Sequence, residues 1–141
     1  MGYDLHKIGL ARPAVLHQAF ARNIVINFFN AKGFKEYEAF QEGTANHKPT
    51  CEKIPDVIFV NMQNKKVAVS VEIEKSWNGS TIYKIQNELI KRYKHQEVFL
   101  YNYTKNEWRK YFKKGKEIVF ENTSLSDVLG VDFAEMIVLK P

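Results

Sequence analysis

Three acidic residues in the middle of the chain have the types and the spacing that metal-dependent chemistry requires. Asp56 follows Pro55 within the apolar run of residues 54–60, and Glu72 and Glu74 end the next apolar run. Side chains on a β-strand point alternately to its two faces. Glu72 and Glu74 therefore share one face of their strand, while four branched apolar residues occupy the other: Val67, Val69, Val71 and Ile73.

The link between the two runs predicts how the acids meet. It spans residues 62–65, which is short enough for a β-hairpin. A turn centred between residues 63 and 64 places Asp56 opposite residue 71, and a turn centred on residue 64 places it opposite residue 72. In the second register Asp56 and Glu72 are cross-strand neighbours with Cβ atoms about 5 Å apart, and such like-charge pairs are normally destabilising. A divalent cation reverses that argument, because carboxylate oxygens converging from two strands are the ligands that Mg²⁺ or Mn²⁺ prefers.

The rest of the pattern predicts the elements that must position these acids. Apolar residues recur about every four positions from Leu16 onward, after Pro13 and before Gly33, which predicts a buried helix over residues 13–32. A second amphipathic helix is expected over residues 80–93. Strands are expected over residues 34–40, 54–60, 66–74, 98–103 and 117–120, a short helix over 106–112, and the start of another helix at 124–128. This order predicts an α/β fold with a mixed sheet of four to five strands flanked by helices.

These motifs and their order resemble the PD-(D/E)xK nuclease superfamily, whose restriction-endonuclease-like core runs helix, three strands, helix, strand. The resemblance covers about residues 13–103: the Pro55-Asp56 pair opens the second strand, and Glu72-Ile73-Glu74 ends the third. It implies that Asp56, Glu72 and the main-chain carbonyl of Ile73 bind a metal ion. Residues 71–76, which precede a basic helix, are also similar to nuclease-like proteins of plasmids and mobile elements.

One position departs from the pattern of this superfamily. The last position of the motif is usually a lysine that orients or activates the attacking water, and here it is Glu74. Some restriction endonucleases of the superfamily carry glutamate at this place, so the departure is compatible with catalysis. Alternatively, a lysine at another position of the chain can take the place of the motif lysine, as happens elsewhere in the superfamily. Lys75 is adjacent but points to the opposite face of a regular strand unless a bulge redirects it, and Lys84 on the following helix is the other candidate.

A concentration of positive charge follows the acidic motifs. Residues 84–116 contain ten basic and three acidic residues, a net charge of +7 in a chain whose total is +5. Such an excess favours a polyanionic partner such as DNA, and the alternative is an ordinary solvated, lysine-rich surface. We expect Trp108 and Phe112 to be core residues, with basic side chains around them free to contact DNA. The candidate nucleic-acid-binding residues are Lys91, Arg92, Lys105, Arg109, Lys110, Lys113 and Lys114.

The remaining features narrow the class of protein. The chain has 141 residues, is 45% hydrophobic, and is expected to form one domain, with a core at about 13–103 and a basic C-terminal extension at 104–141. Its single cysteine, Cys51, excludes an internal disulfide, and no apolar run is long enough to span a membrane, so we expect a cytoplasmic protein. The four histidines share no metal-ligand spacing and are expected to be solvated or core-edge residues: His6, His17, His47 and His95.

Together these patterns predict a Mg²⁺- or Mn²⁺-dependent endonuclease that hydrolyses phosphodiester bonds in DNA. We expect a homodimer, because cutting two strands requires two sites. Asp56 and Glu72 hold the metal, Glu74 acts as general base or helps to hold a second metal, and a nearby lysine stabilises negative charge. One alternative is a nuclease-fold module that binds DNA or protein without cleaving. The other is an unrelated α/β interaction protein whose acids are solvated groups at strand ends.

Overall fold

The computed structural model describes residues 13–42 and 55–139. Expectations for Ile54, the loop of residues 43–53, Cys51, His6 and His47 lie outside these ranges. Among the residues described, no helix is long and apolar enough to cross a membrane. The elements in chain order are α1 (Pro13–Lys32), β1 (Tyr37–Gln41), β2 (Val57–Asn61), β3 (Val67–Glu74), α2 (Gly79–Tyr83), η1 (Lys84–Arg92, a π-helix), β4 (Glu97–Asn102), β5 (Glu107–Lys114), β6 (Glu117–Glu121), β7 (Leu125–Ser126), β8 (Val131–Asp132) and η2 (Phe133–Glu135, a 3₁₀ turn).

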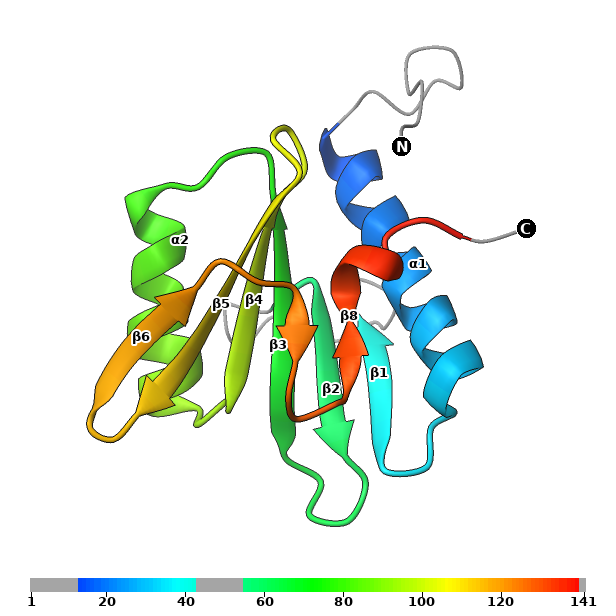
Figure 1. Ribbon diagram of the computed structural model, residues 1–141, viewed down its shortest axis with the longest axis horizontal. Helices are drawn as coiled ribbons and strands as arrows, with labels where there is room; N and C mark the ends of the chain where they lie inside the picture. Colours follow the sequence, from blue (N-terminus) through cyan, green and yellow to red (C-terminus); the bar gives the residue numbers. More distant parts are fainter. Residues whose placement is uncertain (1–12, 43–54, 140–141) are drawn as a thin grey trace.

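Six strands form one sheet in the order β1-β2-β3-β4-β5-β6, and α1 lies on one side of it while α2 and η1 lie on the other (Figure 1). Strands β3 and β4 are parallel and are joined by the α2–η1 crossover, whereas the other neighbouring pairs of this sheet are antiparallel. The predicted α/β fold with a mixed sheet is therefore confirmed. The sheet has more strands than expected, because β5 forms where a helix was expected and joins the expected strand β6 to the sheet.

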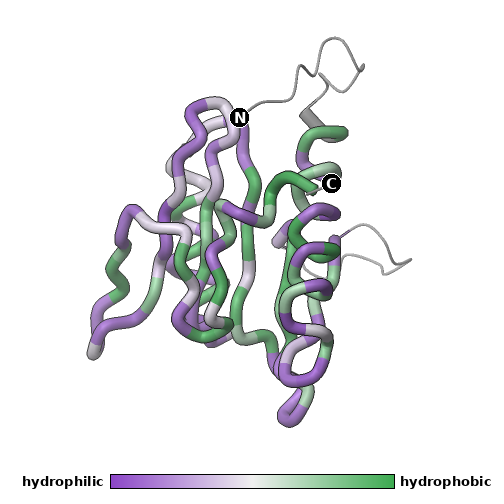
Figure 2. The backbone as a smooth tube through the Cα atoms, turned by 45° about the vertical axis from the view of Figure 1, so that its right-hand side comes forward, coloured by the Kyte–Doolittle hydropathy of each residue, from purple (hydrophilic) through white to green (hydrophobic). Residues whose placement is uncertain are grey.

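The two faces of the sheet bury separate apolar clusters. Alternate residues of β3, such as Val69 and Val71, pack with α1 and with the C-terminal segment around Phe133. On the other face, Ile85 and Leu89 of η1 pack against Leu100 of β4. Figure 2 shows the apolar segments gathered in the central strands and hydrophilic segments at the hairpin tips. Because both faces are covered, β3 is buried along most of its length, including its polar positions.

One predicted element is wrong: residues 106–112, expected as a short helix, belong to β5. Asn106 has a φ of 53°, a left-handed conformation that asparagine tolerates, so the chain turns there and pairs back onto β4. Trp108 is buried against Tyr101 as expected for a core residue, with ring centroids 4.4 Å apart. Phe112 is only half-buried. The aromatic residues of this segment favour a strand. The spacing of four between Trp108 and Phe112 does not distinguish the two structures, because residues four apart share a face in a strand as well as in a helix.

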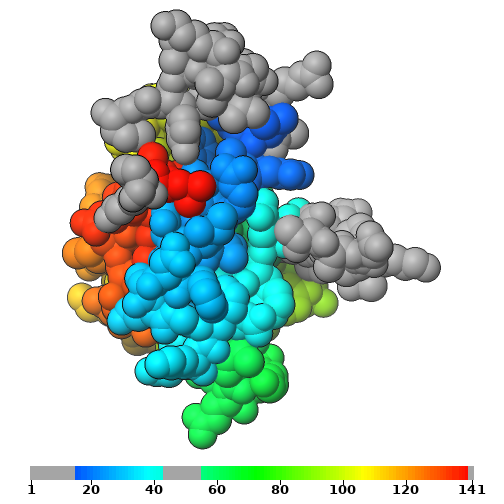
Figure 3. All heavy atoms as spheres, turned by 90° about the vertical axis from the view of Figure 1, so that its right-hand side faces the viewer, coloured from blue at the N-terminus to red at the C-terminus, as the bar shows by residue number. Residues whose placement is uncertain are grey.

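The C-terminal segment also differs from its expected form. Residues 124–128, expected to start a helix, form β7 and the turn that follows it, and β7 pairs with β8. The segment then crosses to α1, where Asn23 Nδ2 donates a hydrogen bond to the Ile137 carbonyl at 2.8 Å. Figure 3 shows this segment lying against α1 on the surface. The chain end that the structure describes is thus fastened to its first helix.

Candidate metal centre

The hairpin of β2 and β3 brings Asp56 to the acids of β3. Next to the turn, Val60 pairs with Val67, but Phe59 pairs with Val69, so Ala68 is an extra residue that forms a β-bulge. From Phe59 back to Val57 the pairing is regular, and Val57 lies opposite Val71. One further step along this register places Asp56 opposite Glu72, which is the second of the two predicted registers.

Main-chain groups on both sides hold Asp56 in place. Its carbonyl accepts a hydrogen bond from the Glu42 N–H at 2.9 Å, which continues the pairing of β1 with β2. Its carboxylate Oδ2 accepts a hydrogen bond from the Ile73 N–H at 2.6 Å. This side chain is therefore aimed across the hairpin at the end of β3 rather than into solvent.

The three carboxylates converge. Asp56, Glu72 and Glu74 each offer an oxygen, and these oxygens all lie within 4.8 Å of one another. Burial raises the pKa of Glu72 to about 8 and that of Asp56 to about 6, against the opposing effect of Lys84. Burial, followed by the charge of Asp56, also raises the pKa of Glu74. Each of the three carboxyl groups therefore resists ionisation, because ionising all three would concentrate negative charge in one partly buried site.

Of the two candidate lysines, Lys84 reaches the cluster. Its Nζ forms an ion pair with Glu72 Oε2, and both side chains are largely buried. Lys84 is the first residue of η1, and the side chain of Asn78, which accepts a hydrogen bond from the Thr81 N–H at 2.9 Å, caps the preceding α2. Lys75 is exposed and forms no ion pair within the described part of the chain. The crossover helix therefore supplies the cation that the strand does not.

The Ile73 carbonyl is oriented toward the same site. In a strand, the N–H and C=O of one residue point to the same neighbour. The Ile73 N–H binds Asp56, whereas the carbonyl of the next residue, Glu74, accepts from the Tyr103 N–H on the opposite side at 3.2 Å. The Ile73 carbonyl consequently faces the Asp56 side of the strand.

Two residues that the sequence did not single out border the cluster. His17 of α1 lies near enough to Glu74 for their charges to interact, although burial dominates and lowers the pKa of His17. Its ring packs edge-on against Tyr103, with centroids 5.6 Å apart. His17 Nε2 and Tyr103 Oη are both buried and have no hydrogen-bond partner within the described ranges. No spacing signal links position 17 to positions 72–74, so only the packing of α1 against the sheet reveals this neighbour.

The expected nucleic-acid-binding residues do not form one surface. Lys105 and Arg109 lie at the end of the sheet that carries the acids, because β5 begins where β3 and β4 finish. Lys110 was expected at a DNA-contacting surface and is instead buried, where it pairs with Glu97 and Asp127. The other four residues are exposed near the opposite end of the sheet, at the close of η1 and of β5: Lys91, Arg92, Lys113 and Lys114.

The donor set fits a hard divalent cation. Three carboxylates face one cation, Lys84, so the ionised cluster carries a net charge of −2, and oxygen ligands of this kind suit Mg²⁺ or Mn²⁺. Asp56 and Glu74 have no ion-pair partner among the residues that the structure describes. Without a cation this arrangement opposes folding, which is unusual for groups that have only a structural role.

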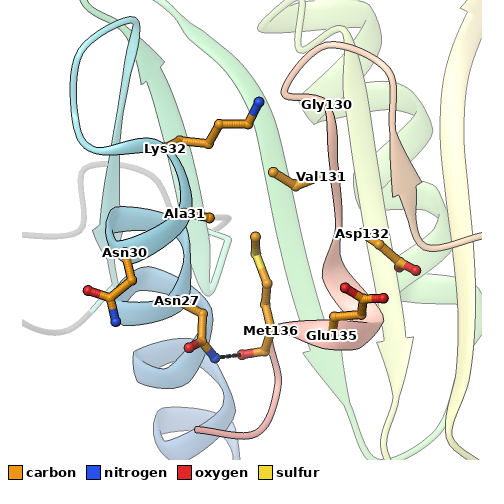
Figure 4. A pocket seen from close by; sticks show the side chains of 9 residues that line it. All are labelled: Asn27, Asn30, Ala31, Lys32, Gly130, Val131, Asp132, Glu135 and Met136. Atoms are coloured by element: carbon orange, nitrogen blue, oxygen red, sulfur yellow. Dashed lines mark hydrogen bonds between the residues drawn. The ribbon is translucent and has the colours of Figure 1, made fainter. Parts of the chain in front are cut away.

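A separate hollow of about 560 Å³ lies between the end of α1 and the segment from Gly130 to Met136 (Figure 4). The Asn27 amide that points into it donates a hydrogen bond to the Met136 carbonyl at 2.8 Å and so fastens the C-terminal segment. This hollow adjoins the last turns of α1, whereas His17 beside the carboxylates lies near the start of that helix. It is therefore distinct from the candidate metal centre.

Comparison with known proteins agrees with the architecture. A solved structure described as "a putative nuclease belonging to DUF820", from Anabaena variabilis ATCC 29413, superposes with a TM-score of 0.55 over 87% of this chain and 82% of that chain, at 14% sequence identity. No family model matches the sequence, and no curated protein is detectably similar to it. Topology, helical layers and structural neighbour together identify the restriction-endonuclease-like α/β fold.

Proposed function

We propose that the chain is a metal-dependent nuclease of the PD-(D/E)xK type that hydrolyses phosphodiester bonds in DNA. The observation that carries the proposal is the convergence of Asp56, Glu72 and Glu74 within 4.8 Å at the end of the hairpin, with Lys84 beside them. The structural neighbour that is described as "a putative nuclease" supports it. Because a duplex has two strands to cut, the proposal includes a homodimer.

In this proposal each side chain has a distinct role. Asp56, Glu72 and the Ile73 carbonyl hold Mg²⁺ or Mn²⁺, which when bound polarises the phosphate and lowers the pKa of water. Glu74 is half-buried and its pKa is raised, so it suits a general base that accepts the proton of the attacking water. The water oxygen bonds to phosphorus, the phosphorus–oxygen bond to the leaving group breaks, and the leaving oxygen takes a proton from solvent. Lys84 stabilises the negative charge that develops on the phosphate.

The test combines metal binding with cleavage. Mg²⁺ and Mn²⁺ are titrated calorimetrically into the full chain and into Asp56→Ala, and both proteins are assayed on supercoiled plasmid. We expect Asp56→Ala to lose metal binding and to lower cleavage more than 100-fold, since loss of even an outer-shell partner of a metal ligand costs about 10–100-fold. Metal binding without nicking of any DNA form would support a non-cleaving nuclease-fold module. No metal binding by the parent chain would refute the proposal.

A pair of matched variants separates the two lysines. Lys84→Met and Lys75→Met remove the same charge, but the first removes it from beside Glu72 and the second from an exposed position. We expect Lys84→Met to lower kcat by about 10²–10³-fold, as for other groups that stabilise transition-state charge, while metal affinity is retained or increases because a competing cation is gone. Lys75→Met is expected to change kcat less than twofold. Equal losses in the two variants would contradict the role assigned to Lys84.

A further inference from the structure

A second hollow, of about 570 Å³, opens beside the start of β5. Both tryptophans of the chain, Trp77 and Trp108, line it together with Arg109. Among the described residues, Trp77 Nε1 and Arg109 Nε are buried N–H groups without a hydrogen-bond partner. Trp108, the neighbour of Arg109 on β5, belongs to the apolar cluster on the opposite face of the sheet. Buried donors are normally satisfied, so two unsatisfied donors beside one hollow favour a ligand that accepts hydrogen bonds.

Arg109 is the basic residue in the lining of the hollow, and Glu107, whose side chain is exposed, is the acidic one. The Arg109 guanidinium carbon lies 4.1 Å from the ring centroids of both Trp77 and Phe120, so the group packs against two aromatic rings. Its Nη1 group donates a hydrogen bond to the Tyr111 hydroxyl at 3.0 Å. Within the described ranges no acidic side chain forms an ion pair with it. The guanidinium is thus held rigidly with its remaining in-plane donors available, the geometry that binds phosphate through paired hydrogen bonds.

The sheet places this guanidinium in line with the carboxylate centre. Glu72 pairs in register with Leu100, and Leu100 pairs with Arg109, so the three side chains occupy one row on one face of the sheet. Glu72 and Arg109 are two strands apart, a separation of about 10 Å between backbones.

We propose that the hollow beside Trp77 and Arg109 binds a phosphate group of the nucleic-acid strand whose scissile bond lies at the carboxylates. This inference rests on the proposed function for the identity of the strand, whereas the anion site itself depends only on Arg109 and its surroundings. The ligand is a phosphate of the strand, either a diester of the backbone or a terminal monoester. Its seat on a rigid, stacked guanidinium fixes how far the strand extends past the metal.

Tryptophan fluorescence reports directly on this site, because both tryptophans line it. The full chain is titrated in EDTA with inorganic phosphate, with an oligonucleotide that has no terminal phosphate, and with the same oligonucleotide carrying a 5′-phosphate. We expect a saturable response to inorganic phosphate and to at least one oligonucleotide. A response that requires the 5′-phosphate would assign a terminal monoester, and equal responses would assign a backbone diester. No saturable response to any of the three, or one to inorganic phosphate alone, would overturn the proposal.

The matched variants are Arg109→Gln and Lys113→Gln, which remove one positive charge each from the same strand. We expect Arg109→Gln to weaken phosphate and oligonucleotide binding at least tenfold, and Lys113→Gln to weaken it less than twofold. Arg109→Lys retains the charge without the planar fork and is expected to lie between them, which keeps the test valid if Arg109→Gln unfolds. Equal affinities in all variants would overturn the proposal. Since EDTA removes metal, a failure at this site is distinguishable from a failure of the metal centre, which the calorimetric titration measures separately.

Discussion

Two clusters of buried charged residues lie on the same sheet and are built in opposite ways. At the start of β4, Glu97 accepts hydrogen bonds from the Ser126 hydroxyl at 2.6 Å and from the Asp127 N–H at 3.0 Å, and its Oε2 lies 3.4 Å from Lys110 Nζ. Lys110 also binds the Asp127 carboxylate at 2.5 Å. At the end of β3, by contrast, three carboxylates share one cation, Lys84.

The difference shows which buried charges stabilise the fold and which are held for another purpose. Burial lowers the pKa of Lys110, but Asp127 and Glu97 outweigh it and the net shift is upward, as expected for a cation with good partners. In the carboxylate centre, burial raises the pKa values of Glu72 and Asp56 even though Lys84 is close. The Glu97 cluster fastens the C-terminal segment to the sheet, whereas the carboxylate centre lacks positive charge that a cation can supply.

The largest expected effect is on the satisfied cluster. Glu97→Ala leaves Lys110 buried and removes the acceptor that holds β7, and breaking a buried pair by deleting one partner typically costs about 3–5 kcal/mol. We expect a loss of this size in the free energy of unfolding, measured by urea denaturation. A loss below about 1 kcal/mol would show that the Glu97 cluster does not support the fold. It would also remove the difference between this cluster and the carboxylate centre.

The second effect has the opposite sign and depends on pH. The pKa of Glu72 is about 8 in the folded protein, above the ordinary value of 4.5, so the folded state binds more protons than the unfolded state between these values and the parent loses stability as the pH rises. Glu72→Gln does not titrate, so we expect it to be more stable than the parent at pH 8, and we expect this advantage to shrink as the pH falls.

Urea denaturation of both proteins in EDTA at pH 6.5, 7 and 8 measures this difference. Burial lowers the pKa of His95 from 6.5 to about 4, which adds a trend of opposite sign only at pH values up to about the unfolded value, and His95 is present in both proteins. A stability difference that stays constant over this range would contradict the assignment of an uncompensated carboxylate. Saturating Mg²⁺ at about 100 times Kd is expected to stabilise the parent by about 2.7 kcal/mol, and to have little effect on the variant.

The smallest expected effect on the free energy of unfolding comes from an exposed ion pair, which serves as a reference for the two buried clusters. Glu88 and Arg92 form an ion pair one helical turn apart at 3.5 Å, with the arginine side chain 65% exposed. Exposed pairs of this kind contribute about 0.3–0.5 kcal/mol. We expect Glu88→Gln to change the free energy of unfolding by no more than this, and the change should shrink in 1 M salt. A larger, salt-resistant loss would mean that the exposed Glu88–Arg92 pair cannot serve as a reference for the two buried clusters.

Local patterns were sufficient for the parts of the fold that depend on sequence neighbours. The spacing of apolar residues predicted α1 with its bounds, and the alternation in residues 66–74 predicted β3 and the shared face of Glu72 and Glu74. Hairpin geometry reduced the position of Asp56 to two registers, one of which the structure adopts. These predictions succeeded because the interactions that decide them lie within about twenty residues.

Features that depend on distant contacts could not be predicted in the same way. Lys110 has the composition of a solvated surface position, and only the pairing of β5 with β4 and the return of β7 bury it. His17 meets Glu74 through the packing of α1 on the sheet, and Arg109 meets Trp77 across three strands. In each case the partner is fixed by tertiary packing, which sequence spacing does not encode.

The bulge at Ala68 has a genetic consequence. Deleting the codon for Ala68 leaves every partner from Val57 to Val71 unchanged, so Asp56 still faces Glu72. Deleting the codon for Ser70, with turn and bulge retained, moves both acids of β3 by one position and onto the opposite face. Two in-frame deletions only two codons apart would thus differ completely in outcome: one keeps the carboxylates together, and the other yields a gene that still encodes all of them but no longer assembles the centre.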